Sequence, residues 1–152
     1  MEMVDILNRD GSPSGKQASK EEVHEKGLWH RSAHVWFVNN KNEILLQKRS
    51  DDLVNHPGKY DISAAGHLSA GDTKIKGALR EVEEELGIKL EEKDLIHIGE
   101  IKNESTQHEG LYINKEYDDV YLVRKDLSTS DFVIQKSEVA EVKYIPIQEL
   151  KT

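Results

Sequence analysis

Apolar residues along this chain gather in short runs separated by polar turns, a pattern typical of a protein built largely from β-strands. The runs at residues 29–38 and 43–48 flank the polar segment Asn39–Asn42, and together they predict a β-hairpin. Four further runs predict strands at residues 60–68, 94–103, 117–124 and 141–145. Their order predicts a mixed sheet covered by helices.

One segment, residues 73–87, repeats its apolar residues at the period of an α-helix. The apolar stripe consists of Ile75, Ala78, Leu79, Val82 and Leu86. Asp72 stands just before this segment and is predicted to cap its first turn. Gly87 is predicted to end the helix in a left-handed conformation.

The first 27 residues form an N-terminal extension with structural signals of its own. A short strand is predicted at the start, followed by a loop over the turn-rich residues Asn8–Gly15. Ser19 and Glu22 form a capping-box pattern, which predicts a helix over residues 20–26 that ends at Gly27. At the other end of the chain, residues 147–151 are predicted to begin a last helical turn.

Four carboxylates stand near the end of the predicted 73–87 helix, where they oppose the helix dipole. At about 100° per residue, Glu81, Glu84 and Glu85 fall on one face, while Glu83 projects to the other side of the apolar stripe. Three convergent carboxylates suit a hard cation such as Mg²⁺ or Mn²⁺, which would relieve their repulsion. The alternative is a solvated acidic helix face.

Composition narrows the class of protein. A chain of 152 residues is long enough for one domain with a sizeable core, so residues 1–152 are expected to form a single domain. The net charge of −8 argues against a nucleic-acid polymer as partner, and the absence of cysteine excludes disulfides and thiolate sites. Neither a membrane-spanning apolar run nor a signal-peptide pattern is present, so we expect no membrane partner and a cytoplasmic location.

The spacing of Gly66, Asp72 and the segment 80–88 resembles the Nudix box, a glycine-to-helix signature that here covers residues 66–88. Every signature position matches except Asp72, where the family pattern has glutamate. The segments on either side of the box fit the family as well. The resemblance implies an α/β (α+β) fold, namely the α/β/α sandwich of the Nudix fold with a mixed β-sheet.

The resemblance also implies a chemistry, the metal-assisted attack of water on a diphosphate, with Mg²⁺ or Mn²⁺ as cofactor. The catalytic residues would be Glu81, Glu84 and Arg80, with Arg80 holding Glu81 through a charge-assisted bond. The implied metal ligands are Gly66, through its carbonyl, and the carboxylates of Glu81, Glu84 and Glu85. Asp72 retains a carboxylate on a shorter arm, so capping is its expected role.

Residues outside the box are candidates for the general base and for substrate binding. The identity of the base differs among relatives, and the sequence leaves five carboxylates open, in or near one loop: Glu104, Glu109, Glu116, Asp118 and Asp119. Arg49, at the end of a predicted strand, is the leading contact for the diphosphate because a guanidinium binds phosphate bidentately. Lys48, Lys59 and His67 are the other substrate-binding candidates, with simple solvation as the alternative for the cations.

Residues 23–31 and 58–67 resemble the isopentenyl diphosphate isomerase branch of the superfamily, in which three histidines and two glutamates bind a metal. His24, His30 and His67 therefore form a candidate second metal site, unless they are packed structural residues. The isomerases carry a catalytic cysteine just before the glycine-histidine pair, and Ala65 stands there in this chain. Without a thiol, isomerase chemistry of the usual kind is not expected.

The sequence thus predicts a Nudix hydrolase that cleaves a diphosphate bond in a nucleoside diphosphate derivative or a similar small molecule. Four aromatic residues are candidates for stacking a base, with core packing as the alternative: Trp29, Trp36, Tyr60 and Tyr112. Two rival functions stay open, an isopentenyl diphosphate isomerase-like enzyme and a non-catalytic regulator that binds a diphosphate ligand. The N-terminal extension could also reach a neighbouring chain, which predicts a homodimer.

Overall fold

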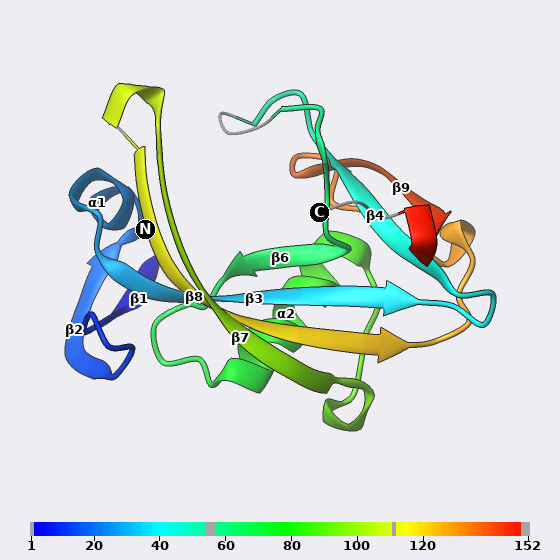
Figure 1. The fold of residues 1–152 in the computed structure, drawn as a ribbon, viewed down its shortest axis with the longest axis horizontal. Helices are drawn as coiled ribbons and strands as arrows, with labels where there is room; N and C mark the ends of the chain where they lie inside the picture. Colours follow the sequence, from blue (N-terminus) through cyan, green and yellow to red (C-terminus); the bar gives the residue numbers. More distant parts are fainter. Residues whose placement is uncertain (1, 54–56, 111, 150–152) are drawn as a thin grey trace.

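The computed structural model describes residues 2–53, 57–110 and 112–149 (Figure 1). The strands are β1 (Met3–Leu7), β2 (Pro13–Ser19), β3 (Trp29–Val38), β4 (Glu43–Arg49), β5 (Tyr60–Asp61), β6 (Ala64–His67), β7 (Ile96–Gln107), β8 (Tyr112–Arg124) and β9 (Val139–Pro146). The α-helices are α1 (Lys20–Lys26) and α2 (Lys74–Leu86). Short 3₁₀ turns cover Glu92–Asp94, His108–Gly110, Thr129–Asp131 and Ile147–Glu149.

A mixed sheet forms the centre of the molecule, in the order β5-β4-β3-β8-β7. Strand β6 pairs with the middle of β3, and β9 pairs with β4. The β3–β8 pair is parallel, and the other pairs of this sheet are antiparallel. The predicted mixed sheet with covering helices is therefore confirmed.

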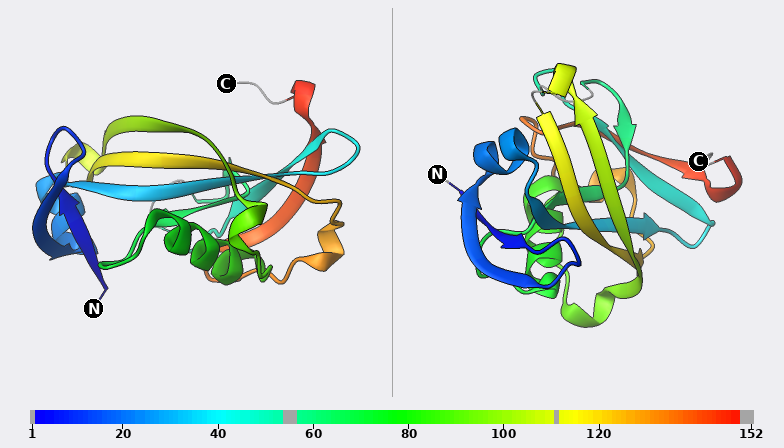
Figure 2. Two further views of the ribbon diagram at one scale, coloured as in Figure 1. Left: turned by 90° about the horizontal axis from the view of Figure 1, so that it is seen from below. Right: turned by 60° about the vertical axis from the view of Figure 1, so that its left-hand side comes forward.

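The two faces of this sheet have different partners. The odd-numbered residues Ala33, Val35 and Phe37 of β3 join the main apolar cluster with α2, which lies along one face (Figure 2). Even-numbered residues of β3, His30 among them, point to the other face, because successive side chains of a strand alternate. Helix α1 packs at one end of the sheet against β8, where the ring of His24 stacks on Tyr112.

Helix α2 has the predicted apolar stripe and the predicted end, but a different cap. Ala78, Val82 and Leu86 are fully buried, and Gly87 adopts the left-handed conformation with φ of 69°. The predicted N-cap at Asp72 is wrong, because the side chain of Thr73 accepts the bond from the backbone N–H of Lys76. The carboxylate of Asp72 instead accepts hydrogen bonds from other residues, which are described with the candidate site.

The N-terminal extension folds back on its own chain. Helix α1 has the predicted bounds, with Ser19 as N-cap and Gly27 as the left-handed C-cap. The segment predicted as a loop over residues 8–15 is shorter than expected, since Pro13 already begins β2 in a hairpin with β1. The backbone N–H of Ala70 donates to the carbonyl of Met3, so β1 is tied to the loop that precedes α2.

Several further segments differ from their predicted bounds. The strand predicted at residues 60–68 is split into β5 and β6 around Ser63, whose hydroxyl donates to the carbonyl of Leu45 and accepts from the N–H of Phe37. The strands predicted at 94–103 and 117–124 are longer, because they extend into one hairpin that ends in the 3₁₀ turn His108–Gly110. The predicted last turn is 3₁₀ over Ile147–Glu149, and residues 150 and 151 lie outside the described residues.

Among the described residues, no helix has the length and apolar character needed to cross a membrane.

Candidate active site

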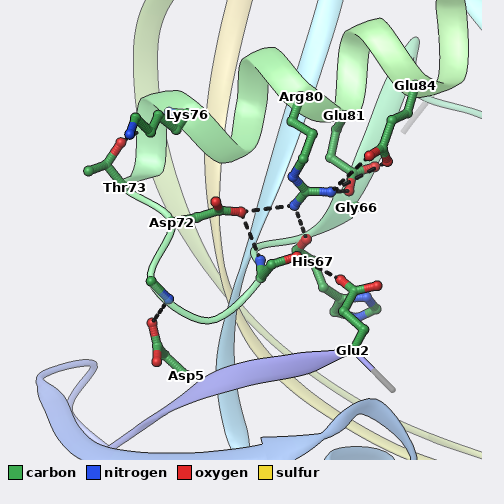
Figure 3. Close-up of polar contacts among 12 residues, drawn as sticks. Glu2, Asp5, Gly66, His67, Asp72, Thr73, Lys76, Arg80, Glu81 and Glu84 are labelled. Atoms are coloured by element: carbon green, nitrogen blue, oxygen red, sulfur yellow. Dashed lines mark hydrogen bonds and ion pairs between the residues drawn. The ribbon is translucent and has the colours of Figure 1, made fainter.

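Glu81 and Glu84 project from α2 toward the backbone around Gly66 of β6 (Figure 3). Glu81 and Glu85 are buried, at 8% and 9% exposure, whereas the side chain of Glu84 is 49% exposed. The backbone of β6 makes this burial feasible, because a Cβ atom added at Gly66 would lie 2.1 Å from Oε2 of Glu81. A glycine at position 66 is thus needed for Glu81 to lie against the strand.

Burial changes the ionisation of both carboxyls. It raises the pKa of Glu81 to about 7, with the Arg80 guanidinium acting against the shift. Burial, and after it the charge of Glu81, raise the pKa of Glu85 to about 8, although Glu85 Oε1 accepts bonds from Gln47 and from the N–H of Ala65 at 3.1 Å each. Two buried carboxyls that hold their protons in this way are suited to a hard dication, which would replace the protons.

Arg80 connects the box helix to the loop before it. Its guanidinium donates to Glu81 at 3.2 Å, to Asp72 at 2.9 Å and to the carbonyl of His67 at 3.3 Å (Figure 3). Asp72 also accepts from the N–H of Ser69 at 3.0 Å. These contacts explain why Asp72 does not cap α2: its carboxylate positions Arg80, and Arg80 in turn holds Glu81.

The glutamates open into a cavity of about 340 Å³ on the α2 side of β6. Besides box residues, Arg49 from β4 and Lys20 from α1 line it, together with Glu2, Gln135 and Glu138. The sequence predicted Arg49 as a phosphate contact but gave no sign of Lys20, because a lysine in a short exposed helix looks like any solvated lysine. Lys48 and Lys59 line neither this cavity nor the next one in the described part of the chain.

A second cavity, of about 310 Å³, adjoins the first and shares Arg49, Ala65, Gly66 and His67 with it. Its remaining walls come from β3, β5 and the β7–β8 hairpin: Ser32, His34, Asp61, Asn103, Ser105, Tyr112, Asn114 and Glu116. Of the aromatic residues considered for base stacking, Tyr112 lines this cavity, whereas Trp29 is buried against Tyr117. Trp36 is half-buried on β3, and the exposed ring of Tyr60 lies under Lys143.

The three histidines predicted as a second metal site come together beside this cavity. The candidate ligand atoms of His24, His30 and His67 lie within 4.8 Å of one another. Nδ1 of His24 lies 2.9 Å from the carbonyl of Lys20, and Nδ1 of His30 lies 3.0 Å from that of Leu28. These bonds place the ring proton on Nδ1 and leave the buried Nε2 atoms, which have no hydrogen-bond partner among described residues, as free lone pairs.

Electrostatics favours the neutral form of His24 and His67, the state in which imidazole binds a metal. Burial, and then the neighbouring His30, lower the pKa of His24, and the same two causes lower that of His67 to about 3. Glu116 lies 3.5 Å from His30 and 3.8 Å from His67, so a carboxylate completes the group. The donor set fits a divalent transition metal.

The five general-base candidates separate in the structure. Glu104 and Glu109 are exposed on the β7–β8 hairpin. Glu116, Asp118 and Asp119 are buried and lie within β8, which begins at Tyr112, ahead of the predicted start of the strand at residue 117. Asp119 points to the α2 face and pairs with Arg31 at 3.0 Å, whereas burial and the adjacent Glu116 raise the pKa of Asp118 to about 9.

Comparison with known proteins agrees with this geometry. The family model described as NUDIX domain matches residues 28–152. The chain is 44% identical to Nudix hydrolase 3 of Arabidopsis thaliana over 99% of its own length but only 20% of that relative's length. It is 35% identical to an uncharacterized Nudix hydrolase of Clostridium acetobutylicum, over 98% and 72% of the two chains.

Two other similarities bear on the branch and on the fold. Isopentenyl-diphosphate Delta-isomerase 1 of Mus musculus is 27% identical, over 95% of this chain and 67% of the relative. A crystal structure of a Deinococcus radiodurans protein has a TM-score of 0.70 at 17% identity, over 95% and 83% of the two chains, and this likeness supports the fold. With the box geometry and the family match in agreement, the chain belongs to the Nudix family.

Proposed function

We propose that this protein is a divalent-cation-dependent hydrolase that cleaves the diphosphate linkage of a nucleoside diphosphate derivative or a similar small molecule. The observation that carries the proposal is the buried pair Glu81 and Glu85. Among the described residues, Glu81 forms an ion pair with the guanidinium of Arg80, at 3.2 Å. Two ionised carboxylates at this depth need a further positive charge.

The ligands proposed for the cation are the carboxylates of Glu81, Glu84 and Glu85 and the carbonyl of Gly66. That carbonyl already accepts from the Ser32 hydroxyl at 2.8 Å and retains a second lone pair. When bound, Mg²⁺ or Mn²⁺ supplies two effects, since it polarises a phosphoryl oxygen and lowers the pKa of a bound water.

The remaining roles belong to side chains of the chain itself. Arg80 holds Glu81 in place, and the exposed Glu84 orients the attacking water. Arg49 and Lys20 bring positive charge to the cavity that the glutamates line, where they bind the non-reacting phosphate oxygens. Because Arg49 lines both cavities, a substrate that bends around the edge of β6 contacts it from either side.

We infer that His24, His30 and His67, with Glu116, hold a second cation beside the other cavity. The free Nε2 lone pairs support this role. Such a cation would help to bind the part of the substrate in the second cavity.

A substrate panel tests the proposal. The protein is incubated in Mg²⁺ or Mn²⁺ with nucleoside diphosphate derivatives, dinucleoside polyphosphates and isopentenyl diphosphate. The products are separated by chromatography and identified by mass spectrometry. Hydrolysis of at least one compound is expected, with loss of roughly 10² to 10³-fold in Glu85→Gln, since an essential ligand is removed. Hydrolysis that survives unchanged in Glu85→Gln contradicts the assigned site.

Two rivals give different results in the same assay. The isomerase reading is favoured by the histidine cluster and by the isomerase relatives, and it predicts an allylic isomer of unchanged mass. Ala65 argues against it because the position supplies no thiol. A non-catalytic regulator would bind a panel compound without converting it, and Glu85→Gln would then have no activity to lose.

A further inference from the structure

Strand β7 lies at the edge of the central sheet (Figure 1). It ends the strand order β5-β4-β3-β8-β7, and among the described strands β8 is its one partner. The strand is 12 residues long, so a row of backbone N–H and C=O groups points outward along its open side. The N-terminal extension differs in this respect, because it is bonded to the loop before α2 of its own chain.

This edge strand exposes large apolar side chains. Ile96, Ile98 and Ile101 are 45%, 57% and 54% exposed. The register of β7 against β8 shifts between His97 and Gly99, so the regular part of the edge begins at Gly99 and contains Ile101. A long edge strand with exposed apolar side chains is a surface on which another strand can pair.

The segment from Gly99 to Asn103 is complementary to itself. A two-fold axis perpendicular to the sheet at Ile101 pairs the strand antiparallel with its copy, so Ile101 meets Ile101 of the partner subunit. Glu100 then faces the partner's Lys102, and Lys102 faces the partner's Glu100. Apolar pairs and opposite charges stabilise antiparallel strands when they stand directly opposite each other. An axis at Glu100 or at Lys102 would instead place like charges opposite each other.

Both charged side chains are accessible for such pairs. Glu100 and Lys102 lie on the same face of the sheet, because they are two residues apart on a strand. The side chain of Glu100 contacts Arg31 and is still 41% exposed. Lys102 is also exposed, with its Nζ atom 4.9 Å from the centre of the Trp29 ring. Each charge is therefore open to a further partner.

We propose that β7 pairs with β7 of a second copy of this chain, which joins the two central sheets across a two-fold axis at Ile101. The α2 helices of both chains lie on the same side of the joined sheet, because an axis perpendicular to a sheet does not exchange its faces. The contact is small, so the dimer is weak and its population depends on concentration. Asn103 lines the second cavity, so the interface borders that cavity, but the proposal does not depend on the proposed function.

Cysteine cross-linking tests the position of the axis. The chain contains no cysteine, so Ile101→Cys introduces a single thiol. Directly opposite residues of antiparallel strands have Cα atoms about 4.5 to 5.5 Å apart, a distance that a disulfide can bridge. Mild oxidation of the full chain should therefore produce a covalent dimer on non-reducing electrophoresis.

The matched control for this experiment is Ile98→Cys. Ile98 is as exposed as Ile101, but in the proposed dimer the two copies of residue 98 lie roughly 20 Å apart along the paired strands. This variant should stay unlinked. Equal cross-linking of the two variants, or no cross-linking of Ile101→Cys, would overturn the proposed register.

Charge reversal tests the same contact in the absence of a covalent bond. Sedimentation equilibrium should show a monomer–dimer equilibrium for the native chain. Glu100→Lys places lysines opposite each other at two points and should raise the dissociation constant about tenfold or more, as should Lys102→Glu. The variant that combines both changes should dimerise as the native chain does, which separates the contact between chains from the loss of the Glu100–Arg31 pair.

The control for charge is Glu92→Lys, which makes the same change in the exposed 3₁₀ turn before β7 and should leave the dissociation constant unaltered. Far-ultraviolet circular dichroism confirms that each variant is folded. A native chain that sediments as a monomer at every concentration would overturn the proposal and leave the proposed function intact. A dimer that Glu100→Lys does not weaken would place the interface on another surface.

Discussion

The substitution Gly66→Ala is the sharpest test of how the box is assembled. A Cβ atom at this position would lie 2.1 Å from Oε2 and 2.2 Å from Cδ of Glu81, whereas ordinary contacts begin at 3.4 Å. The Glu81 carboxylate must therefore retreat by more than about 1 Å, away from the carbonyl with which it is proposed to share a cation. Gly66 is not among the residues with positive φ, so the effect of the methyl group is steric and the backbone conformation stays accessible to alanine.

The expected result has two parts. A displacement of about 1 Å in a catalytic group costs roughly 100-fold in rate, so kcat should fall by about that factor. Overpacking against β6 should lower the free energy of unfolding by about 1 to 3 kcal/mol. Turnover, Mn²⁺ affinity by titration calorimetry and urea unfolding measure the two effects separately.

Gly99→Ala is the matched control, because an added Cβ there meets nothing within 4 Å and the residue has no positive φ. It should leave turnover and metal affinity unchanged, and stability within about 0.5 kcal/mol. If Gly66→Ala retains both Mn²⁺ affinity and kcat within a factor of two, Glu81 does not need its place against Gly66, and the geometric argument fails.

Three other outcomes follow from the site. Thr73→Ala removes the α2 cap and should lower the free energy of unfolding in urea by about 1 kcal/mol, with Mn²⁺ affinity unchanged. Asp72→Ala releases Arg80 and should weaken Mn²⁺ binding. The pKa values of Glu81 and Glu85, about 7 and 8 against 4.5 for the free side chain, mean that the cation-free folded state binds more protons than the unfolded chain. In chelator, the free energy of unfolding should therefore fall as pH rises from about 5 to about 8 and level off above that. A slope that Glu85→Gln leaves unaltered would contradict this cause. Arg49→Lys should raise KM about tenfold with kcat little changed, since a bidentate phosphate contact is lost. Steady-state kinetics on the substrate found in the panel measures both constants. A fall in kcat of about tenfold would show instead that Arg49 acts in the transition state.

The features that the sequence predicted correctly depend on local signals. Strand β3 has the bounds that its apolar run predicted, α1 begins and ends at its capping residues, and Gly87 ends α2. The box spacing also placed Glu81 and Glu85 on one helix face, because helical periodicity alone determines that face.

The features it missed depend on tertiary contacts. Asp72 and Thr73 are both good capping residues, and the choice between them is made by Arg80, eight positions further on, which pairs with Asp72. The grouping of His34 with Glu116 and Asp118 gives no local sign in the sequence, since the two carboxylates lie on β8 and the parallel pairing with β3 brings them together. Single-residue patterns carry no information on such pairings.

The N-terminal extension shows why the functional unit is larger than the family match. That match begins at residue 28, yet Lys20 of α1 lines the cavity beside the glutamates and His24 of α1 belongs to the three-histidine cluster. The extension is bonded to the loop before α2, since the N–H of Gly71 donates to Asp5 at 2.9 Å and the Ser69 hydroxyl donates to Glu2 at 2.8 Å. The same loop carries Asp72, which holds Arg80.

Any shift of the extension is therefore transmitted to the guanidinium that positions Glu81, as well as to a ligand of the three-histidine site. Differences in substrate between this chain and other Nudix proteins should accordingly be sought in residues 2–27 as much as in the box, because the extension contributes side chains to both ends of the site that the box alone leaves open.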